Sequence, residues 1–515
     1  NNFNRGLVEL TGTNTYGSRT RIDDVTLFAI EGQGLPVNSG IRFEGNANDR
    51  EAIFMSNGTM NRNIGSGAGE VWWDTERGGF AARGGTFTVT LEGGATLIWG
   101  GRDNGFDGHW VQFGSQYADS MVELTNDIDL GNATRRIQVA DNPDVKTDFV
   151  RLSGNISATG ADNGDQFRFN EDGDNSFRGG LIELTGTNTY GSRTRIDDVT
   201  VFAIEGVGLP TISNIRFEGN SDDREAIFMS SGTMNRNIGN GAGEVSWDVE
   251  RGGFAARGGT FTITLEGGST LNWNSNSTGF DNHRLQLNSQ YADDVVTLTN
   301  DIDGNNGDRY VHVWDNADVT TDWAVMSGNL TNFRDFRVRG DGLLVLSGTL
   351  YVEDDIEVYD GPTLDIQGGL LRYGSNGDDD IRIQNGSGFV IGPAVVGTHF
   401  DEFNVEDDSW ARIEGTLQFN QEDIFIDDNS HVEVSGFLYS SGDYDVEDGS
   451  SLTVTGTGHV QADDDFELRR GATLTAAPGT TVTIYDNFEI EDGSTVEILG
   501  SLLRTGSQGD DDINV

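Results

Sequence analysis

Pairs of apolar residues separated by one outward position recur along the last third of the chain. From residue 336 onward, such a pair opens a new cycle every 20 to 25 residues. The nine openings are Phe336/Val338, Ile356/Val358, Ile381/Ile383, Phe403/Val405, Ile424/Ile426, Tyr444/Val446, Phe466/Leu468, Phe488/Ile490 and Ile513/Val515. Alternation with a period of two is typical of β-strands that bury one face. Each opening therefore predicts a short strand.

Each cycle also has a turn signal and a second apolar pair at constant offsets. Five residues after an opening stands Gly, Asn or Asp, the residues that best tolerate the left-handed backbone of a tight turn. The second pair follows at offsets eight and ten, and six of eight cycles have Gly at offset twelve. A strand, a turn and a second strand in every ~22 residues predict a β-solenoid in which each cycle is one coil.

The first two thirds of the chain contain a duplication with a longer period. Residues 10–26 read LTGTNTYGSRTRIDDVT and recur unchanged at residues 184–200, an offset of 174. We therefore expect three segments: residues 1–174 as a repeat unit, residues 175–335 as its duplicate, and residues 336–515 as a short-coil segment. Because 174 is close to eight times ~22, we expect about eight coils in each long unit.

A local motif in each long unit resembles a known family. Residues 6–32 (GLVELTGTNTYGSRTRIDDVTLFAIEG) and their copy at residues 180–206 resemble the autotransporter-associated β-strand repeat, which has the form G-x-L-x-L-x-G-x-N-T-Y. The matching positions are Gly6, Val8, Leu10, Gly12, Asn14, Thr15, Tyr16, Thr20, Ile22 and Leu27. The resemblance implies an all-β fold, a right-handed parallel β-helix, in a large bacterial surface or secreted protein. It implies no catalytic residues.

Acidic residues dominate the composition. The chain has 84 Asp and Glu against 33 Lys and Arg, a net charge of −51, and it has no Cys. This charge excludes a nucleic-acid binder, which needs cationic side chains to displace counterions from phosphate. No apolar run reaches the ~20 residues of a membrane span, so we expect no membrane insertion. Without Cys there is neither a disulfide framework nor a thiolate metal site.

A column of acidic residues stands directly before the coil openings. Eight of the nine residues at this position are Asp or Glu, and stacked coils would hold successive members ~4.8 Å apart. Two interpretations are open: the carboxylates bind Ca²⁺, which prefers hard oxygen ligands, or each accepts a backbone N–H where the chain enters a strand. The candidate calcium ligands are Asp355, Asp380, Glu402, Asp423, Asp443 and Asp465.

Patterns that would indicate catalysis are weak. The segment VHVWDNAD at residues 311–318, with Arg309 nearby, has some likeness to a polysaccharide lyase. Its copy at residues 137–144 reads IQVADNPD and lacks both the His and the Trp. A carboxylate pair among so many acidic residues carries almost no information about hydrolysis. We therefore expect that the protein is not an enzyme.

The tryptophans divide into two groups. Trp73 and Trp99 recur in the second unit and are expected to fill the coil interior. Trp72 and Trp110 do not recur, which makes them the better candidates for an exposed contact, for example with a sugar.

These patterns together predict an extracellular or cell-surface structural or adhesive protein, a stiff acidic rod. The chain stops two residues into a coil opening, and neither end carries a polar cap over its edge strands. Either the chain continues beyond these residues, or the last coil of one copy stacks on the first coil of the next. The second case predicts association between copies, end to end into filaments or laterally. The alternative is a polysaccharide-binding or polysaccharide-degrading β-helix, a lyase or a tailspike-like hydrolase, with a surface polysaccharide as partner.

Overall fold

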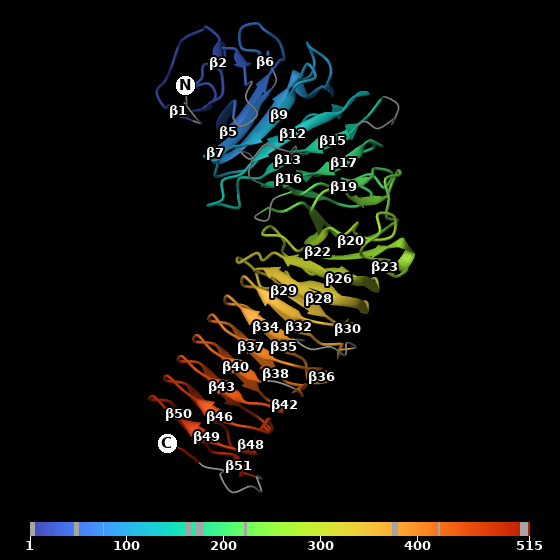
Figure 1. The fold of residues 1–515 in the computed structure, drawn as a ribbon. Coiled ribbons are helices and arrows are strands. Elements are labelled where there is room, and N and C mark those ends of the chain that lie inside the picture. Colours follow the sequence, from blue (N-terminus) through green and yellow to red (C-terminus); the bar gives the residue numbers. More distant parts are fainter. Residues whose placement is uncertain are drawn as a thin grey trace. The chain divides into compact units, whose positions relative to one another are not determined.

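The computed structural model describes residues 6–45, 51–75, 77–159, 166–170, 179–220, 224–372, 380–420, 423–504 and 513–514 (Figure 1). In these residues the structure is almost entirely β, with 52 strands and two short 3-10 helices, η1 (Glu92–Gly94) and η2 (Glu266–Gly268). The strands pair in parallel with strands of neighbouring coils. The prediction of an all-β parallel solenoid is thus confirmed. No helix among the described residues combines the length and the hydropathy needed to cross a membrane.

The chain divides into two compact units, Asn1–Phe261 and Thr262–Val515. The division falls inside the second copy of the duplication, within strand β22 (Arg251–Leu265). Compactness and sequence duplication are different properties, so the three segments with boundaries at residues 174 and 335 stay a prediction.

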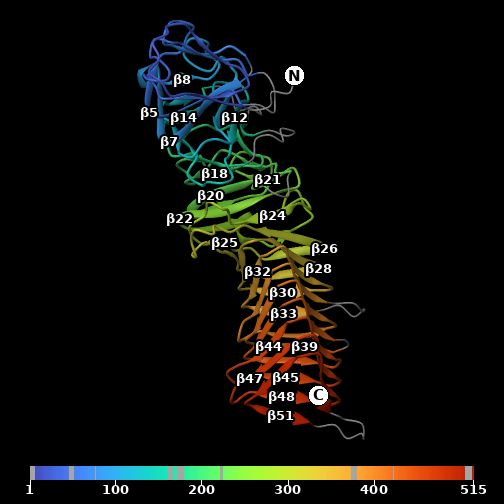
Figure 2. The same ribbon diagram turned by 90° about the vertical axis from the view of Figure 1, so that its left-hand side faces the viewer.

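The second unit is a stack of coils whose strands form three columns (Figures 1 and 2). The first column contains β28 (Leu330–Gly340), β31 (Ile356–Tyr359), β34 (Ile381–Gln384), β37 (Phe403–Val405), β40 (Ile424–Ile426), β43 (Tyr444–Val446), β46 (Phe466–Leu468), β49 (Phe488–Ile490) and β52 (Ile513–Asn514). The second column contains β27 (Ala324–Met326), β29 (Leu343–Leu346), β32 (Thr363–Ile366), β35 (Gly388–Ile391), β38 (Trp410–Ile413), β41 (His431–Val434), β44 (Ser451–Val454), β47 (Thr473–Ala476) and β50 (Thr495–Ile498). The third column contains β30 (Thr349–Val352), β33 (Gly369–Arg372), β36 (Val396–Phe400), β39 (Thr416–Phe419), β42 (Phe437–Ser440), β45 (His459–Ala462), β48 (Thr481–Ile484) and β51 (Ser501–Arg504). The unit also contains β23 (Leu271–Asn272), β24 (Arg284–Leu287), β25 (Val296–Leu298) and β26 (Ile302–Val313).

The strand register of the first column confirms the coil openings that the periodicity predicts. Ile356 pairs with Ile381, and Tyr444 pairs with Phe466. Each of these side chains is fully buried. Burying one large apolar side chain stabilises a fold by ~1.5–3 kcal/mol. A one-residue slip would turn every such side chain to solvent, so burial holds the register.

The third column is the element that the sequence pattern missed. Its inward residues begin with Leu350 and Leu370, each fourteen residues after an opening, but Val460 and Val482 come sixteen residues after theirs. This drift between coils hides the strand from a search at one constant offset. Each coil of this segment therefore has three strands around its core.

The first unit has the same parallel architecture with longer connections. One column contains β1 (Leu7–Leu10), β3 (Thr26–Ala29), β5 (Ile53–Arg62), β7 (Arg77–Leu91), β10 (Val122–Leu124), β13 (Val150–Leu152), β16 (Leu181–Leu184), β18 (Thr200–Ala203) and β20 (Ile227–Arg236). Another contains β9 (Trp110–Gly114), β12 (Arg135–Ala140), β15 (Gln166–Phe169), β17 (Arg193–Ile196), β19 (Ile215–Phe217) and β21 (Val245–Trp247). Two three-stranded sheets complete it, β2 (Thr20–Ile22) with β4 (Ile41–Phe43) and β6 (Val71–Trp73), and β8 (Leu97–Ile98) with β11 (Ile128–Asp129) and β14 (Ile156–Ser157).

Coil lengths in this unit differ from the expectation. Leu7 pairs with Thr26, 19 residues away, whereas Phe87 pairs with Val122, 35 residues away. Only six strand pairings lead from β1 to its duplicate β16, through β3, β5, β7, β10 and β13. The expectation of about eight coils of ~22 residues in the long unit is therefore wrong. The connections lengthen because they hold additional elements, such as η1, β8 and β9 between β7 and β10.

Aromatic rings fill the core of the first unit. Trp73 and Trp99 are each 1% exposed, and the ring of Phe106 lies 5.0 Å from both indoles, centroid to centroid. The prediction that these two tryptophans fill the interior is confirmed. Trp72 and Trp110 are partly exposed. The guanidinium of Arg42 lies 4.8 Å from the ring centroid of Trp72, and those of Arg77 and Arg136 each lie 4.5 Å from the ring centroid of Trp110.

Candidate cation site

The predicted acidic residues form one column along the second unit. Each lies directly before the first residue of a coil opening, and from Asp355 onward its carbonyl accepts the N–H of the first opening residue one coil earlier. Ile356 donates to the Asp380 carbonyl at 2.9 Å, and Ile424 donates to that of Asp443 at 2.9 Å. The opening column, as we call it, comprises Asp335, Asp355, Asp380, Glu402, Asp423, Asp443, Asp465 and Asn487. Asp512 lies outside the described residues.

Carboxylate oxygens of this column bind backbone N–H groups of the next coil. The N–H of Asp443 donates to Oδ1 of Asp423 at 2.7 Å, and the N–H of Asp465 donates to Oδ1 of Asp443 at 2.9 Å. The same bond joins Asp380 to Asp355 at 3.0 Å and Asn487 to Asp465 at 2.9 Å. The backbone-acceptor interpretation is thus confirmed for these carboxylates. Since the bond occupies only Oδ1, the other oxygen is left for a second partner.

In the upper part of the column, arginine side chains are that second partner. Arg337 lies 2.7 Å from Asp335, and Arg382 lies 3.2 Å from Asp355 and pairs with Asp380. We call Asp335, Asp355 and Asp380 with these two arginines the arginine-paired stretch. Burial raises the pKa of Asp335 and of Asp380 to about 6, although the arginines lower it.

Further along the column no arginine takes this place. Oxygens of Asp443, Asp464 and Asp465 lie within 4.8 Å of one another, and no described cation pairs with them. Together with Asp423 we call them the carboxylate-only stretch. Burial, together with the charges of Asp423, Asp464 and Asp465, raises the pKa of Asp443 to about 6. Burial and the neighbouring carboxylates also raise the pKa of Asp464.

This geometry fits a hard divalent cation. Calcium binds six to eight oxygens at 2.3–2.6 Å, so oxygens on opposite sides of one ion lie about 5 Å apart. Three carboxylates within 4.8 Å meet that condition. They supply fewer oxygens than the ion needs, so water would complete the shell, which is typical of a weak site.

The six predicted ligands fall into different surroundings. Asp443 and Asp465 belong to the carboxylate-only group, whereas Asp355 belongs to a second group, with Asp335 and Glu357, that contacts arginine. Asp380, Glu402 and Asp423 belong to none of the three carboxylate groups found in the described residues. All six stay predictions as ligands. Asp464 was missed as a ligand: acidic residues stand two before most openings, but the sequence pattern does not show that this position comes close to the opening column.

A third group lies at the opposite end of the first-column strands. Asp427, Glu447 and Asp448 hold carboxylate oxygens within 4.8 Å of one another, but Arg470 pairs with both Glu447 and Asp448. The sequence pattern predicted only a turn in this region. The acidic residues three and four positions after the openings were the signal that it also concentrates charge.

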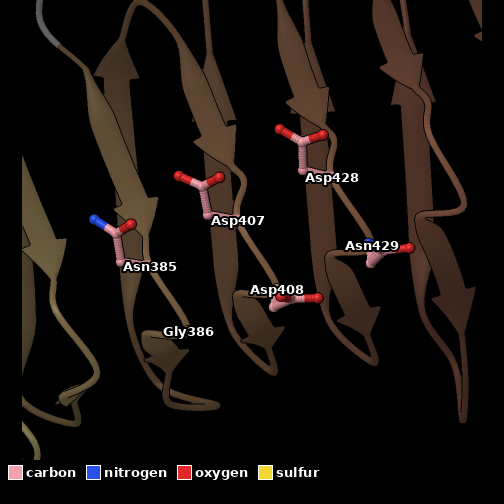
Figure 3. A pocket seen from close by; sticks show the side chains of 6 residues that line it. All are labelled: Asn385, Gly386, Asp407, Asp408, Asp428 and Asn429. Atoms are coloured by element: carbon pink, nitrogen blue, oxygen red, sulfur yellow. The ribbon is translucent and has the colours of Figure 1, made fainter.

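The turns next to this group form a shallow, open hollow (Figure 3). It is lined by Asn385, Gly386, Asp407, Asp408, Asp428 and Asn429. Figure 3 shows the Asp407 and Asp428 side chains projecting in the same direction from successive coils. Both aspartates have left-handed backbones, with φ of 58° and 53°, which Asp tolerates better than most residues. The three predicted turns that line the hollow are thus present, each with two left-handed residues.

In the segment with a likeness to a lyase, residues 311–318 with the nearby Arg309, the side chains pack against one another or bind the backbone. The ring of His312 stacks on Trp314 at 4.2 Å between centroids. Arg309 is 5% exposed, and its Nε donates to the Gly304 carbonyl at 2.6 Å. These contacts give Arg309 a role in holding a bend of β26.

Comparisons with family models, with curated proteins and with solved structures found no match for this chain. The resemblance to the autotransporter-associated repeat therefore rests on the residues of the two motifs and stays a prediction.

Proposed function

We propose that this chain is a structural or adhesive protein of the extracellular space or cell surface, and that it performs no catalysis. The observation that carries the proposal is the unbroken register of the first column from Phe336 to Ile513. Continuous backbone hydrogen bonding along one axis resists bending and extension. A secretion route like that of autotransporter passengers is part of the same proposal.

The acidic column supplies the proposed response to cations. Like charges ~4.8 Å apart repel by roughly 0.9 kcal/mol per pair in water, and by more near a protein surface. Calcium bound by Asp443, Asp464 and Asp465 would replace this repulsion with coordination. The proposal is therefore a solenoid that is stiffer and more stable where calcium is abundant. Its association with further copies, end to end or laterally, belongs to the proposal as well.

Thermal unfolding in EDTA and in millimolar Ca²⁺ tests the cation response. We expect a higher melting temperature in Ca²⁺, because an ion that binds only the folded state stabilises it by mass action. Asp464→Asn should remove most of this difference. Asp354→Asn is the matched control, because Asp354 stands at the same position of an arginine-paired coil and should leave the difference intact.

Equal melting temperatures in EDTA and Ca²⁺ would contradict the calcium site. Electron microscopy of the same samples tests the structural role separately, since filaments or bundles are expected. Particles that remain monomeric under all conditions, together with release of sugar ends from a polysaccharide, would contradict the structural role and favour the enzymatic alternative.

A further inference from the structure

Among the residues that the structure describes, the outward face of the third column carries no Asp, Glu, Lys or Arg. Its eight described strands present two outward residues each, in register from β30 to β33 and from β36 to β51. These residues are Thr349, Tyr351, Gly369, Leu371, Val396, Thr398, Thr416, Gln418, Phe437, Tyr439, His459, Gln461, Thr481, Thr483, Ser501 and Leu503. We call them the neutral face. In addition, a bulge in β36 exposes His399 at the edge of this face. Figure 2 labels β39, β45, β48 and β51 of this column, and β42 lies between β39 and β45.

The other two columns differ sharply. Outward positions of the first column include Glu357, Asp445 and Glu467, and those of the second include Asp365 and Glu433. The chain has a net charge of −51, yet these sixteen outward positions on stacked strands hold no carboxylate. Such an exception needs a physical cause.

The side chains of the neutral face suit contact with another surface. Leu371, Val396 and Leu503 are 45%, 54% and 47% exposed. The rings of Phe437 and His459 lie 4.9 Å apart, and burial lowers the pKa of His459, so the imidazole is uncharged at neutral pH. Apolar, aromatic and threonine side chains on a pleated surface are those that interdigitate when two sheets pack ~10 Å apart.

We propose that the neutral face docks onto the neutral face of a second copy of this chain. Two copies that approach through any carboxylate-bearing face must desolvate like charges, which is costly. The neutral face avoids that cost on both partners at once, and a two-fold axis lets one surface serve as its own complement. The neutral face would be the surface through which copies associate laterally, as the proposed function requires. The inference rests on the proposed function only for the role of such a dimer.

The size of the face predicts a weak but specific contact. Eight four-residue strands at ~4.8 Å per coil and ~3.3 Å per residue cover roughly 500 Å² on each copy. The pair would then bury roughly 1,000 Å², the lower limit for a specific interface. Acidic residues stand at the rim, where Tyr439 donates a hydrogen bond to Asp463 at 2.7 Å. Repulsion between rims is screened by salt, so pairing should strengthen as salt increases.

Sedimentation velocity over a concentration series, in EDTA and at about 0.05 M and 0.5 M NaCl, tests the proposal. The wild-type chain should form a dimer that is tighter at the higher salt concentration. Val396→Asp should weaken it at least ten-fold, since the new charge occurs twice in a symmetric contact. Val390→Asp is the matched control, because Val390 lies on the second column of the same coil and should leave the dimer unchanged.

Two outcomes would overturn the proposal. A dimer that Val396→Asp and Val390→Asp affect equally would place the contact elsewhere, for example at the chain ends. A monomer at every salt concentration that instead sediments with an insoluble neutral glucan, and loses that binding with Val396→Asp, would make a polysaccharide the occupant. Neither outcome changes the melting difference between EDTA and Ca²⁺, so failure here is distinguishable from failure of the calcium proposal.

Discussion

Two stretches of the opening column differ in what surrounds their carboxylates. In the arginine-paired stretch, Arg337 and Arg382 each stand between the two apolar residues of an opening pair. Arg337 contacts Asp335, and Arg382 contacts Asp355 and Asp380. In the carboxylate-only stretch, that position holds Phe425, Asp445 and Glu467. The backbone geometry is the same in both, down to the N–H bonds to Oδ1.

The difference shows that one outward position per coil decides the role of the column. Where it is arginine, the carboxylates are parts of an internal ion-pair network. Where it is not, one oxygen accepts a backbone N–H, and no described cation pairs with Asp443, Asp464 or Asp465. The acidic residues by themselves do not distinguish the two cases.

The largest effect is expected from removing an arginine. Arg382→Gln leaves Asp355 and Asp380 without their shared cation, and a partly buried carboxylate that loses its partner costs ~2 kcal/mol of unfolding free energy. Urea unfolding measures this. Arg412→Gln is the control, because Arg412 is 48% exposed and lies 3.4 Å from Glu433, a surface pair worth less than ~0.5 kcal/mol. Equal losses in both variants would show that the network adds nothing.

The pH dependence in EDTA should give the next largest effect. A carboxyl group whose folded pKa is raised from 3.8 to about 6, as for Asp443, holds its proton more tightly in the folded state. Its stabilising contribution is complete below pH ~4 and is lost as the pH rises through ~6. Solvent screening of this partly exposed group reduces the loss to ~1 kcal/mol. Asp443→Asn should flatten this part of the profile of unfolding free energy against pH.

A wild-type profile that rises from pH 4 to pH 6 would contradict the repulsion described for the carboxylate-only stretch. Asp148→Asn provides a comparison in the first unit. Burial and Asp141 raise the pKa of Asp148 to about 7, so this variant should flatten the profile up to a higher pH.

The smallest effect is expected from converting one stretch into the other. Asp445→Arg places a guanidinium beside Asp443 of its own coil and Asp423 of the preceding coil, as Arg382 lies beside Asp380 and Asp355. We expect a gain of ~0.5 kcal/mol in EDTA, limited by repulsion from Arg469, which lies 3.9 Å from Asp445, and a smaller response to Ca²⁺. Differential scanning calorimetry with and without Ca²⁺ measures both. An unchanged calcium response would show that Asp443 and its neighbours are not the ligands.

Much of the second unit could be predicted because its coils are short and their offsets constant. The pairing of Tyr444 with Phe466 follows from periodicity alone, since only one register buries both. The third column could not be predicted in this way, because the position of Val460 relative to its opening differs from that of Leu350. In the candidate site, Asp443 and Asp465 could be predicted from their recurring position. Asp464 could not, because its closeness to them depends on how the turn orients its side chain.

The amino-acid sequence by itself determined the solenoid, the register of its first two columns and the place of the acidic column, because all three depend on periodic burial and on turn chemistry. Tertiary structure decided which carboxylates meet an arginine and which do not. It also decided that the residues outward of β30 to β51, far apart in the chain, gather into one uncharged face. Both outcomes depend on contacts between coils, because stacking brings residues ~22 positions apart in the chain to within ~4.8 Å of one another.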